Sequence, residues 1–96
     1  MEKHKITIEY CPKCGWLLRS AWLAQEILTT FVDDMEEVSL KPSVVGGVFK
    51  INLNGKEIFD RKQAEHFPEA KEIKQMIRDV ISPERSLGHS DTKVVH

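Results

Sequence analysis

The fold is decided by residues 5–16, which read KITIEYCPKCGW. In residues 5–10, apolar and polar side chains alternate with a period of two, which predicts a strand with one buried face. After the CPKC turn of residues 11–14 the apolar spacing changes to three or four residues, which predicts an amphipathic helix. A strand, a Cys-x-x-Cys turn and a helix therefore follow one another directly, and the rest of the chain has to be built around that unit.

The helix after the turn is predicted to run for about five turns, until Asp33-Asp34 ends it. Its buried stripe is expected to contain Leu17, Ala21, Ala24, Leu28 and Phe31, widened by Leu18, Trp22 and Ile27. On this spacing, Trp22 is predicted to pack in the core.

The remaining elements follow from alternation and from turn residues. A second strand around Val38 and Leu40 ends at Pro42, and residues 43–47 form a loop that contains two glycines. Residues 49–53 and 56–60 alternate as a third and a fourth strand, joined by Asn54-Gly55, a strong hairpin signal. A second helix is predicted from Pro68 to Ser82-Pro83, with a buried stripe of Ala70, Ile73, Met76, Ile77, Val80 and Ile81.

This element order predicts an α/β protein of the α+β two-layer kind. The first strand, helix and second strand form a βαβ unit with a parallel strand pair, and the hairpin adds two antiparallel strands. Each strand has one polar face, so we expect a four-stranded mixed sheet with both helices on one face. The other face should be solvated or serve as a docking surface, and it carries Thr7, Glu9, Glu37, Ser39, Lys50 and Asn52.

Composition restricts the class of protein. With 96 residues, 41% hydrophobic and 30% charged, the chain is expected to form one soluble domain over residues 1–81, followed by a loosely docked or mobile tail over 82–96. The net charge of -1 argues against a nucleic-acid partner bound through a basic surface. We see neither a secretory signal nor an apolar run that could span a membrane, so we expect no membrane partner and a cytoplasmic location.

Cys11 and Cys14 are the candidate catalytic residues. A Cys-x-x-Cys pair beside a βαβ unit is typical of a thioredoxin-like redox motif. The unpaired N–H groups in the first turn of a helix favour a thiolate over a thiol, and the charge of Lys13 acts in the same direction. One thiolate can attack a disulfide and the other can resolve the mixed disulfide, while Pro12 fixes φ at no cost in helical hydrogen bonds.

Other uses of the pair stay open at this point. The spacing also fits a zinc knuckle, but a structural zinc needs four ligands, so a second chain would have to complete the site. Two buried, inert cysteines or a copper(I) chaperone are the remaining alternatives. We expect no metal.

The motifs resemble those of the selenoprotein W/T/H family, also called the Rdx family. Residues 10–16 are similar to its Cys-x-x-Cys or Cys-x-x-selenocysteine turn, and GGVFKI at 46–51 is similar to its glycine-then-aromatic third strand. GKEIF at 55–59 and FPE at 67–69 resemble its fourth strand and the start of its last helix. The resemblance covers roughly residues 5–81.

The resemblance implies a thioredoxin-like βαβββα fold and a small thiol oxidoreductase of cell redox homeostasis. It implies no bound cofactor, protein or glutathione disulfides as partners, and glutathione as a co-substrate. We expect the substrate or partner to meet Pro12, Lys13, Trp16, Gly46 and Gly47.

The resemblance also raises the question of which sulfur attacks. Thioredoxin-like chemistry makes Cys11 the attacking thiolate and Cys14 the resolving one, whereas the position of selenium in the family points to Cys14. We take Cys11 as attacking. The chain lacks a proline directly before its third strand, so thioredoxin-style pairing with a substrate is in doubt.

Two alternatives to an oxidoreductase belong to other classes of protein. One is a non-enzymatic interaction module whose thiols gate binding, and the other is a zinc-knuckle protein that completes its site across a dimer. A weak homodimer is also left open.

Overall fold

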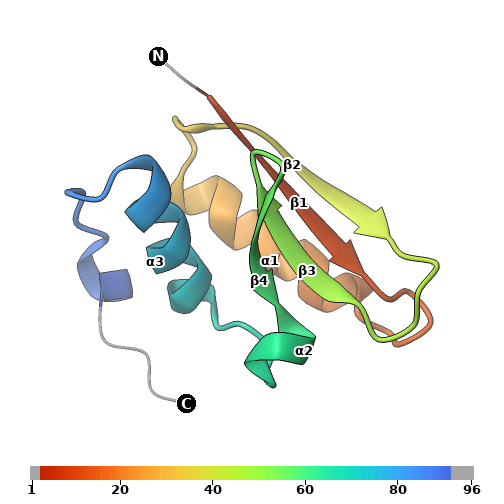
Figure 1. The fold of residues 1–96 in the computed structure, drawn as a ribbon. Coiled ribbons are helices and arrows are strands. Elements are labelled where there is room, and N and C mark those ends of the chain that lie inside the picture. Colours follow the sequence, from red (N-terminus) through yellow and green to blue (C-terminus); the bar gives the residue numbers. More distant parts are fainter. Residues whose placement is uncertain (1–2, 92–96) are drawn as a thin grey trace.

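A computed structural model describes residues 3–91 as a four-stranded sheet with helices against it (Figure 1). The elements in chain order are β1 (His4–Tyr10), α1 (Leu17–Thr30), β2 (Met35–Pro42), β3 (Phe49–Leu53), β4 (Lys56–Asp60), α2 (Arg61–Ala64), α3 (Ala70–Ile81) and a 3-10 turn η1 (Gly88–Asp91). Residues 1–2 and 92–96, which include the end of the predicted tail, lie outside the described residues. No helix within 3–91 is long and apolar enough to cross a bilayer.

The sheet has the strand order β2-β1-β3-β4. β1 pairs with β2 in parallel and with β3 in antiparallel orientation, and β3 pairs antiparallel with β4. The β3–β4 turn has positive φ at Asn54 (54°) and Gly55 (85°), the backbone that a two-residue hairpin of this kind requires. The predicted mixed sheet, with its βαβ unit and its Asn-Gly hairpin, is confirmed.

The core lies between the sheet and the two longer helices. Ile6, Ile8 and Ile51 have no exposed surface, and they alternate along the strands with side chains that point to the opposite face. That opposite face is lined by polar groups, among them the ion pair between Lys50 and Glu57, whose N and O atoms are 3.8 Å apart. Both longer helices cover the same face of the sheet, as the alternation predicts (Figure 1).

The rotational phase of α1 differs from the prediction. Its buried residues are Ser20, Leu23, Ala24 and Ile27. Four side chains that were expected inside are between 42% and 82% exposed, namely Leu17, Leu18, Trp22 and Leu28. The helix is apolar around most of its circumference, so the spacing alone allows two phases. The buried Ser20 hydroxyl donates to the backbone oxygen of Trp16 at 2.8 Å, which removes the cost of burying it.

Trp16, which is half-buried, packs against the core, whereas Trp22 does not. Trp16 precedes α1 and packs edge-to-face on Phe67 and Phe49, with ring centroids 4.8 Å and 6.4 Å away. The rings of Phe49 and Phe67 lie 5.5 Å from each other. We call Trp16, Phe49 and Phe67 the aromatic cluster.

The short helix α2 was not predicted. Its N-cap is Asp60, whose carboxylate accepts the N–H of Lys62 at 3.0 Å. The next helix, α3, begins at Ala70 rather than Pro68, because Glu69 is its N-cap and forms a capping box with Glu72.

The predicted stripe of α3 is correct except at Val80. Three of its residues pack against the core although they are only partly buried, namely Ala70, Met76 and Ile81. Ile73 and Ile77 are buried, whereas Val80, expected inside, is 60% exposed.

The described part of the tail docks on the body of the protein. Arg85 donates to both carboxylate oxygens of Asp34, at 2.7 and 2.9 Å, and Leu87 packs against the core. Asp34 directly precedes β2, and its backbone oxygen accepts the N–H of His4 at the start of β1. The tail therefore binds at the end of the sheet opposite to the Cys-x-x-Cys turn.

Candidate functional site

Cys11 and Cys14 form a disulfide in the turn that joins β1 to α1. Their Cα atoms are 5.3 Å apart, within the usual range for disulfides. The N–H of Cys11 donates to the backbone oxygen of Val48 at 2.8 Å, which ties the turn to the chain that leads into β3. The N–H of Gly15 donates to the oxygen of Pro12, and Gly15 has a φ of 79°, which glycine adopts without strain.

Contrary to the prediction from the sequence pattern, the redox turn and the helix do not follow one another directly, because two residues separate Cys14 from Leu17. The left-handed backbone of Gly15 interrupts the helical path, so α1 starts at Leu17 with Trp16 as its N-cap. No side chain caps this helix end. The first N–H groups of α1 therefore have no side-chain acceptor.

The two cysteines differ in exposure. Cys11 is 2% exposed, because it is enclosed at the end of the central strand. Cys14 is exposed. An incoming thiol therefore meets the Cys14 side of the disulfide more readily than the Cys11 side.

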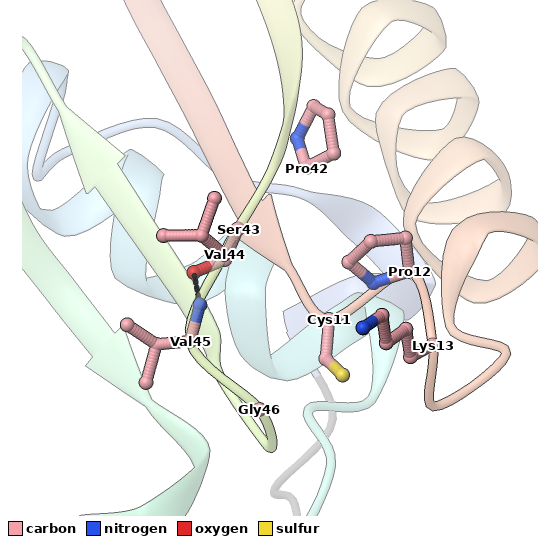
Figure 2. Close-up of a pocket in the computed structure, with 8 residues that line it drawn as sticks. All are labelled: Cys11, Pro12, Lys13, Pro42, Ser43, Val44, Val45 and Gly46. Carbon is pink, nitrogen blue, oxygen red and sulfur yellow. Dashed lines mark hydrogen bonds between the residues drawn. The ribbon is translucent and has the colours of Figure 1, made fainter.

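A cavity of about 420 Å³ opens beside Cys11, between the redox turn and the β2–β3 loop (Figure 2). Figure 2 shows Pro12 and Lys13 on one side, with Val44, Val45 and Gly46 on the other. The complete lining consists of Cys11, Pro12, Lys13, Pro42, Ser43, Val44, Val45 and Gly46. The surface is mainly apolar, and Lys13 is the one charged residue among those that line it.

Two hydrogen bonds fix the start of the β2–β3 loop beside the end of β1. The N–H of Ser43 donates to the oxygen of Tyr10 at 2.8 Å, and the Ser43 hydroxyl accepts the N–H of Val45 at 3.0 Å (Figure 2). These bonds leave the Val44 side chain fully exposed and Val45 56% exposed. The loop thus presents two valines to solvent next to a disulfide.

The structure brings only part of the predicted site together around the cavity. Cys11, Pro12, Lys13 and Gly46 line it. Trp16 belongs to the aromatic cluster, and Gly47 lies under the Lys62 side chain, whose Cε would be 3.6 Å from a Cβ at that glycine.

Sequence reasoning missed Val44 and Val45. The available signal was an apolar pair within a loop otherwise made of proline, serine and glycine. Exposed apolar side chains in a loop beside a reactive group are suited to contact with a partner.

The described residues 3–91 contain no group of three or more His, Cys, Asp or Glu side chains placed to share a metal ion. A zinc site that uses Cys11 and Cys14 would need further ligands from elsewhere.

Comparison with known proteins agrees with this geometry. The sequence model of the Rdx family matches residues 5–79. None of the curated proteins compared with the chain matches it.

Two crystal structures are similar over most of the chain. A selenoprotein W-related protein from Vibrio cholerae is 52% identical, with a TM-score of 0.81, over 84% of this chain and all of that one. A protein from Bordetella parapertussis is 51% identical, with a TM-score of 0.78, over 81% of this chain and 98% of that one. The family match over residues 5–79 includes the redox turn, α1 and the strands β2 to β4.

Proposed function

We propose, from the premise that the chain belongs to the Rdx family, that it is a small thiol–disulfide redox protein of cell redox homeostasis. The thioredoxin-like fold and the paired Cys11 and Cys14 support a redox role. The observation that carries the proposal is the disulfide itself, placed at the carboxyl end of the central strand and next to a cavity.

The proposed cycle transfers two electrons. In the reduced protein, one thiolate attacks a sulfur of a substrate disulfide, the substrate S–S bond breaks, and one substrate thiolate leaves and takes up a proton. The second cysteine thiolate then attacks the sulfur of the first, which forms the Cys11–Cys14 bond and releases the other substrate thiol. The same steps in reverse, with a thiol reductant, regenerate the dithiol.

We propose that Cys14 is the sulfur that exchanges with the substrate and that Cys11 resolves the mixed disulfide. This reverses the order taken from thioredoxin-like chemistry. Its support is the difference in burial, since Cys14 is exposed and Cys11 is 2% exposed. A substrate sulfur has to approach along the axis of the bond that breaks, and the buried sulfur offers less room for that approach.

The proposed substrates are protein or glutathione disulfides. The cavity volume of about 420 Å³ lies within the range of small-ligand sites, and its apolar lining suits the chain that flanks a substrate cysteine. Glutathione as co-substrate and the cytoplasm as compartment, where reductants keep thiols available, belong to this proposal.

The proposal is tested by redox titration of the purified protein. The protein is equilibrated in dithiothreitol buffers of graded potential, alkylated and weighed by mass spectrometry. We expect two thiols to appear together as the potential falls, with the slope of a two-electron couple. Failure of the pair to oxidise in any buffer contradicts the proposal, and a stoichiometric zinc in the protein as isolated supports the zinc alternative instead.

The order of the two sulfurs is tested by Cys11→Ser and Cys14→Ser. With oxidised glutathione, Cys11→Ser should accumulate a mixed disulfide at Cys14 several times faster than Cys14→Ser does at Cys11, because only the former exposes its sulfur. The adduct is measured by intact mass over time. Equal or inverted rates would restore Cys11 as the attacking residue.

A further inference from the structure

Two of the four arginines in the chain gather on one aromatic side chain. The guanidinium carbon of Arg19, on α1, lies 3.9 Å from the ring centroid of Phe67. The guanidinium carbon of Arg61, the first residue of α2, lies 4.8 Å from the same centroid and 4.8 Å from that of Trp16. Two positive charges therefore share the aromatic cluster.

These arginines lack the partners that the other two have. Arg78 pairs with Asp79 and Asp91, and Arg85 pairs with Asp34. Within residues 3–91, no ion pair joins a carboxylate to Arg19 or Arg61. Stacking on aromatic rings stabilises the faces of a guanidinium, but it leaves the N–H donors at the edge unpaired.

Arg61 also carries an unsatisfied buried donor. Its Nε has almost no accessible surface and no hydrogen-bond partner. A buried donor without a partner is costly, and two like charges on one ring repel each other. The repulsion between the two charges falls when an anion binds beside them.

The arginines lie at the redox end of the molecule. Figure 1 shows α2 at the same end of the sheet as the Cys-x-x-Cys turn and the β2–β3 loop. Trp16, which stacks on Arg61, follows Cys14 by two residues, and Lys62 lies over Gly47 in the loop next to the cavity. A ligand held by the arginines would therefore extend toward the disulfide.

We infer that Arg19 and Arg61 form an anion subsite that binds a carboxylate of the disulfide substrate. A guanidinium presents a planar fork of donors that matches a carboxylate, and a charge-assisted bond of this kind gives more affinity than a neutral one. The subsite makes the protein selective for anionic disulfides over neutral or cationic ones. This selectivity rests on the proposed function, whereas the binding of a carboxylate does not.

Selectivity is tested with three small disulfides of similar size: the dianionic dithiodipropionate, the neutral hydroxyethyl disulfide and the dicationic cystamine. The protein is reduced with dithiothreitol and freed of it, and the rate of oxidation by each compound is measured. We expect Arg19→Gln and Arg61→Gln each to slow the reaction with dithiodipropionate by about three- to tenfold. The rate with hydroxyethyl disulfide should change less than twofold, and the rate with cystamine should rise.

The matched control is Lys56→Gln, which makes the same change in net charge at the far end of the sheet, beside the β3–β4 turn. It should leave all three rates within twofold. An equal loss in Lys56→Gln, or equal changes with all three compounds in the arginine variants, overturns the inference. Arg61 stacks in the aromatic cluster, so Arg61→Gln could also disturb the fold. Arg61→Lys controls for this, because it keeps the positive charge and removes the planar fork of donors. Arg19 is exposed, so Arg19→Gln tests the subsite with little effect on packing.

Binding is tested separately from redox chemistry. In a Cys11→Ser/Cys14→Ser protein that also carries Trp22→Phe, Trp16 is the remaining tryptophan and reports directly on Arg61. Titration with dithiodipropionate, which cannot react with this protein, should change the Trp16 emission saturably, and Arg61→Gln should weaken the binding by about three- to tenfold. A flat titration overturns the subsite even if the redox cycle holds, and saturable binding with no oxidation of the parent by any disulfide contradicts only the proposed function.

Discussion

Trp16 connects the redox turn to the core through its ring. The residue stands between the glycine that ends the turn and the first residue of α1, and its ring packs on Phe49 and Phe67. Its backbone oxygen also accepts the buried hydroxyl of Ser20. The position of the disulfide is therefore coupled to the packing of a single large side chain.

This coupling predicts a larger loss of stability when Trp16 is replaced than when Trp22 is replaced. Trp16→Leu should lower the free energy of unfolding by about 2 kcal/mol or more, because it leaves a cavity among aromatic rings. Trp22→Leu should change it by less than about 0.5 kcal/mol, because Trp22 is 49% exposed. Urea denaturation of both variants in the oxidised state measures the difference, and a larger loss in Trp22→Leu would contradict the observed phase of α1.

The position of the two cysteines between a strand and a helix could be predicted from the sequence, but the burial of the residues around them could not. Cys11 and Cys14 follow an alternating strand and precede a helical period, so the turn between them was predictable. The buried face of α1 was not predictable, because Leu17, Leu18 and Trp22 form an apolar stripe comparable to the stripe that is buried. Contacts with Phe49 and Phe67, distant in the sequence, decide between the two.

At the scale of elements, a histidine links α2 to α3. One ring nitrogen of His66 lies 2.9 Å from the backbone oxygen of Ala64, and the other lies 3.2 Å from the carboxylate of Glu72. Only the protonated imidazole can donate from both nitrogens at once. The hydrogen bond to Ala64, followed by that to Glu72, accordingly raises the pKa of His66 above its usual value.

A pH dependence of stability follows from this pair of contacts. Because the pKa of His66 is higher in the folded than in the unfolded chain, its contribution is fully present below the unfolded value near 6.5 and is lost as pH rises through the folded value. The urea midpoint of the parent should therefore fall as the pH rises above about 6.5, and His66→Gln should remove that fall. An equal fall of the midpoint in His66→Gln would contradict this assignment.

The short helix α2 could not be predicted from the sequence because of its length. Four residues, RKQA, are too few for a period, and the only local signal is Asp60 as an N-cap before helix-forming side chains. The start of α3 was misplaced by two residues because Pro68 also fits a first helical position. Arg61, part of the proposed anion subsite, meets Trp16 and Phe67 only through the tertiary fold, so the sequence gives no signal for it.

At the scale of the whole molecule, the redox turn and the docked tail lie at opposite ends of the sheet. The turn, the β2–β3 loop and α2 meet at one end, and the described tail docks at the other through Arg85 and Asp34. The tail was predicted to be loosely docked or mobile. Its attachment depends on a pair 51 residues apart in the sequence, for which no local pattern exists.

The docked tail predicts a loss of stability in acid without a loss of redox chemistry. The hydrogen bond from Arg85 lowers the pKa of Asp34, so the pair stabilises the fold above the unfolded value near 3.8, and this stabilisation is lost as pH falls through the folded value. Arg85→Gln should cost about 1 kcal/mol at neutral pH and nothing at strongly acid pH.

Thermal denaturation across this pH range measures the effect, with Lys41→Gln as the charge-matched control. The rate of disulfide exchange should not change in either variant. A slower exchange in Arg85→Gln would mean that the two ends are coupled. The weak homodimer stays a prediction, and sedimentation of the oxidised and reduced protein can test it.

The central place of β1 has a consequence for synthesis of the chain. β1 is translated before the other three strands, and its neighbours in the sheet begin only at Met35 and Phe49. The nascent chain therefore presents both thiols before any strand can pair with β1. Since two cysteines allow a single intrachain pairing, early oxidation on the ribosome cannot produce a wrong isomer. Folding of this chain should therefore need no disulfide isomerase, whether Cys11 and Cys14 are oxidised or reduced at the end of translation.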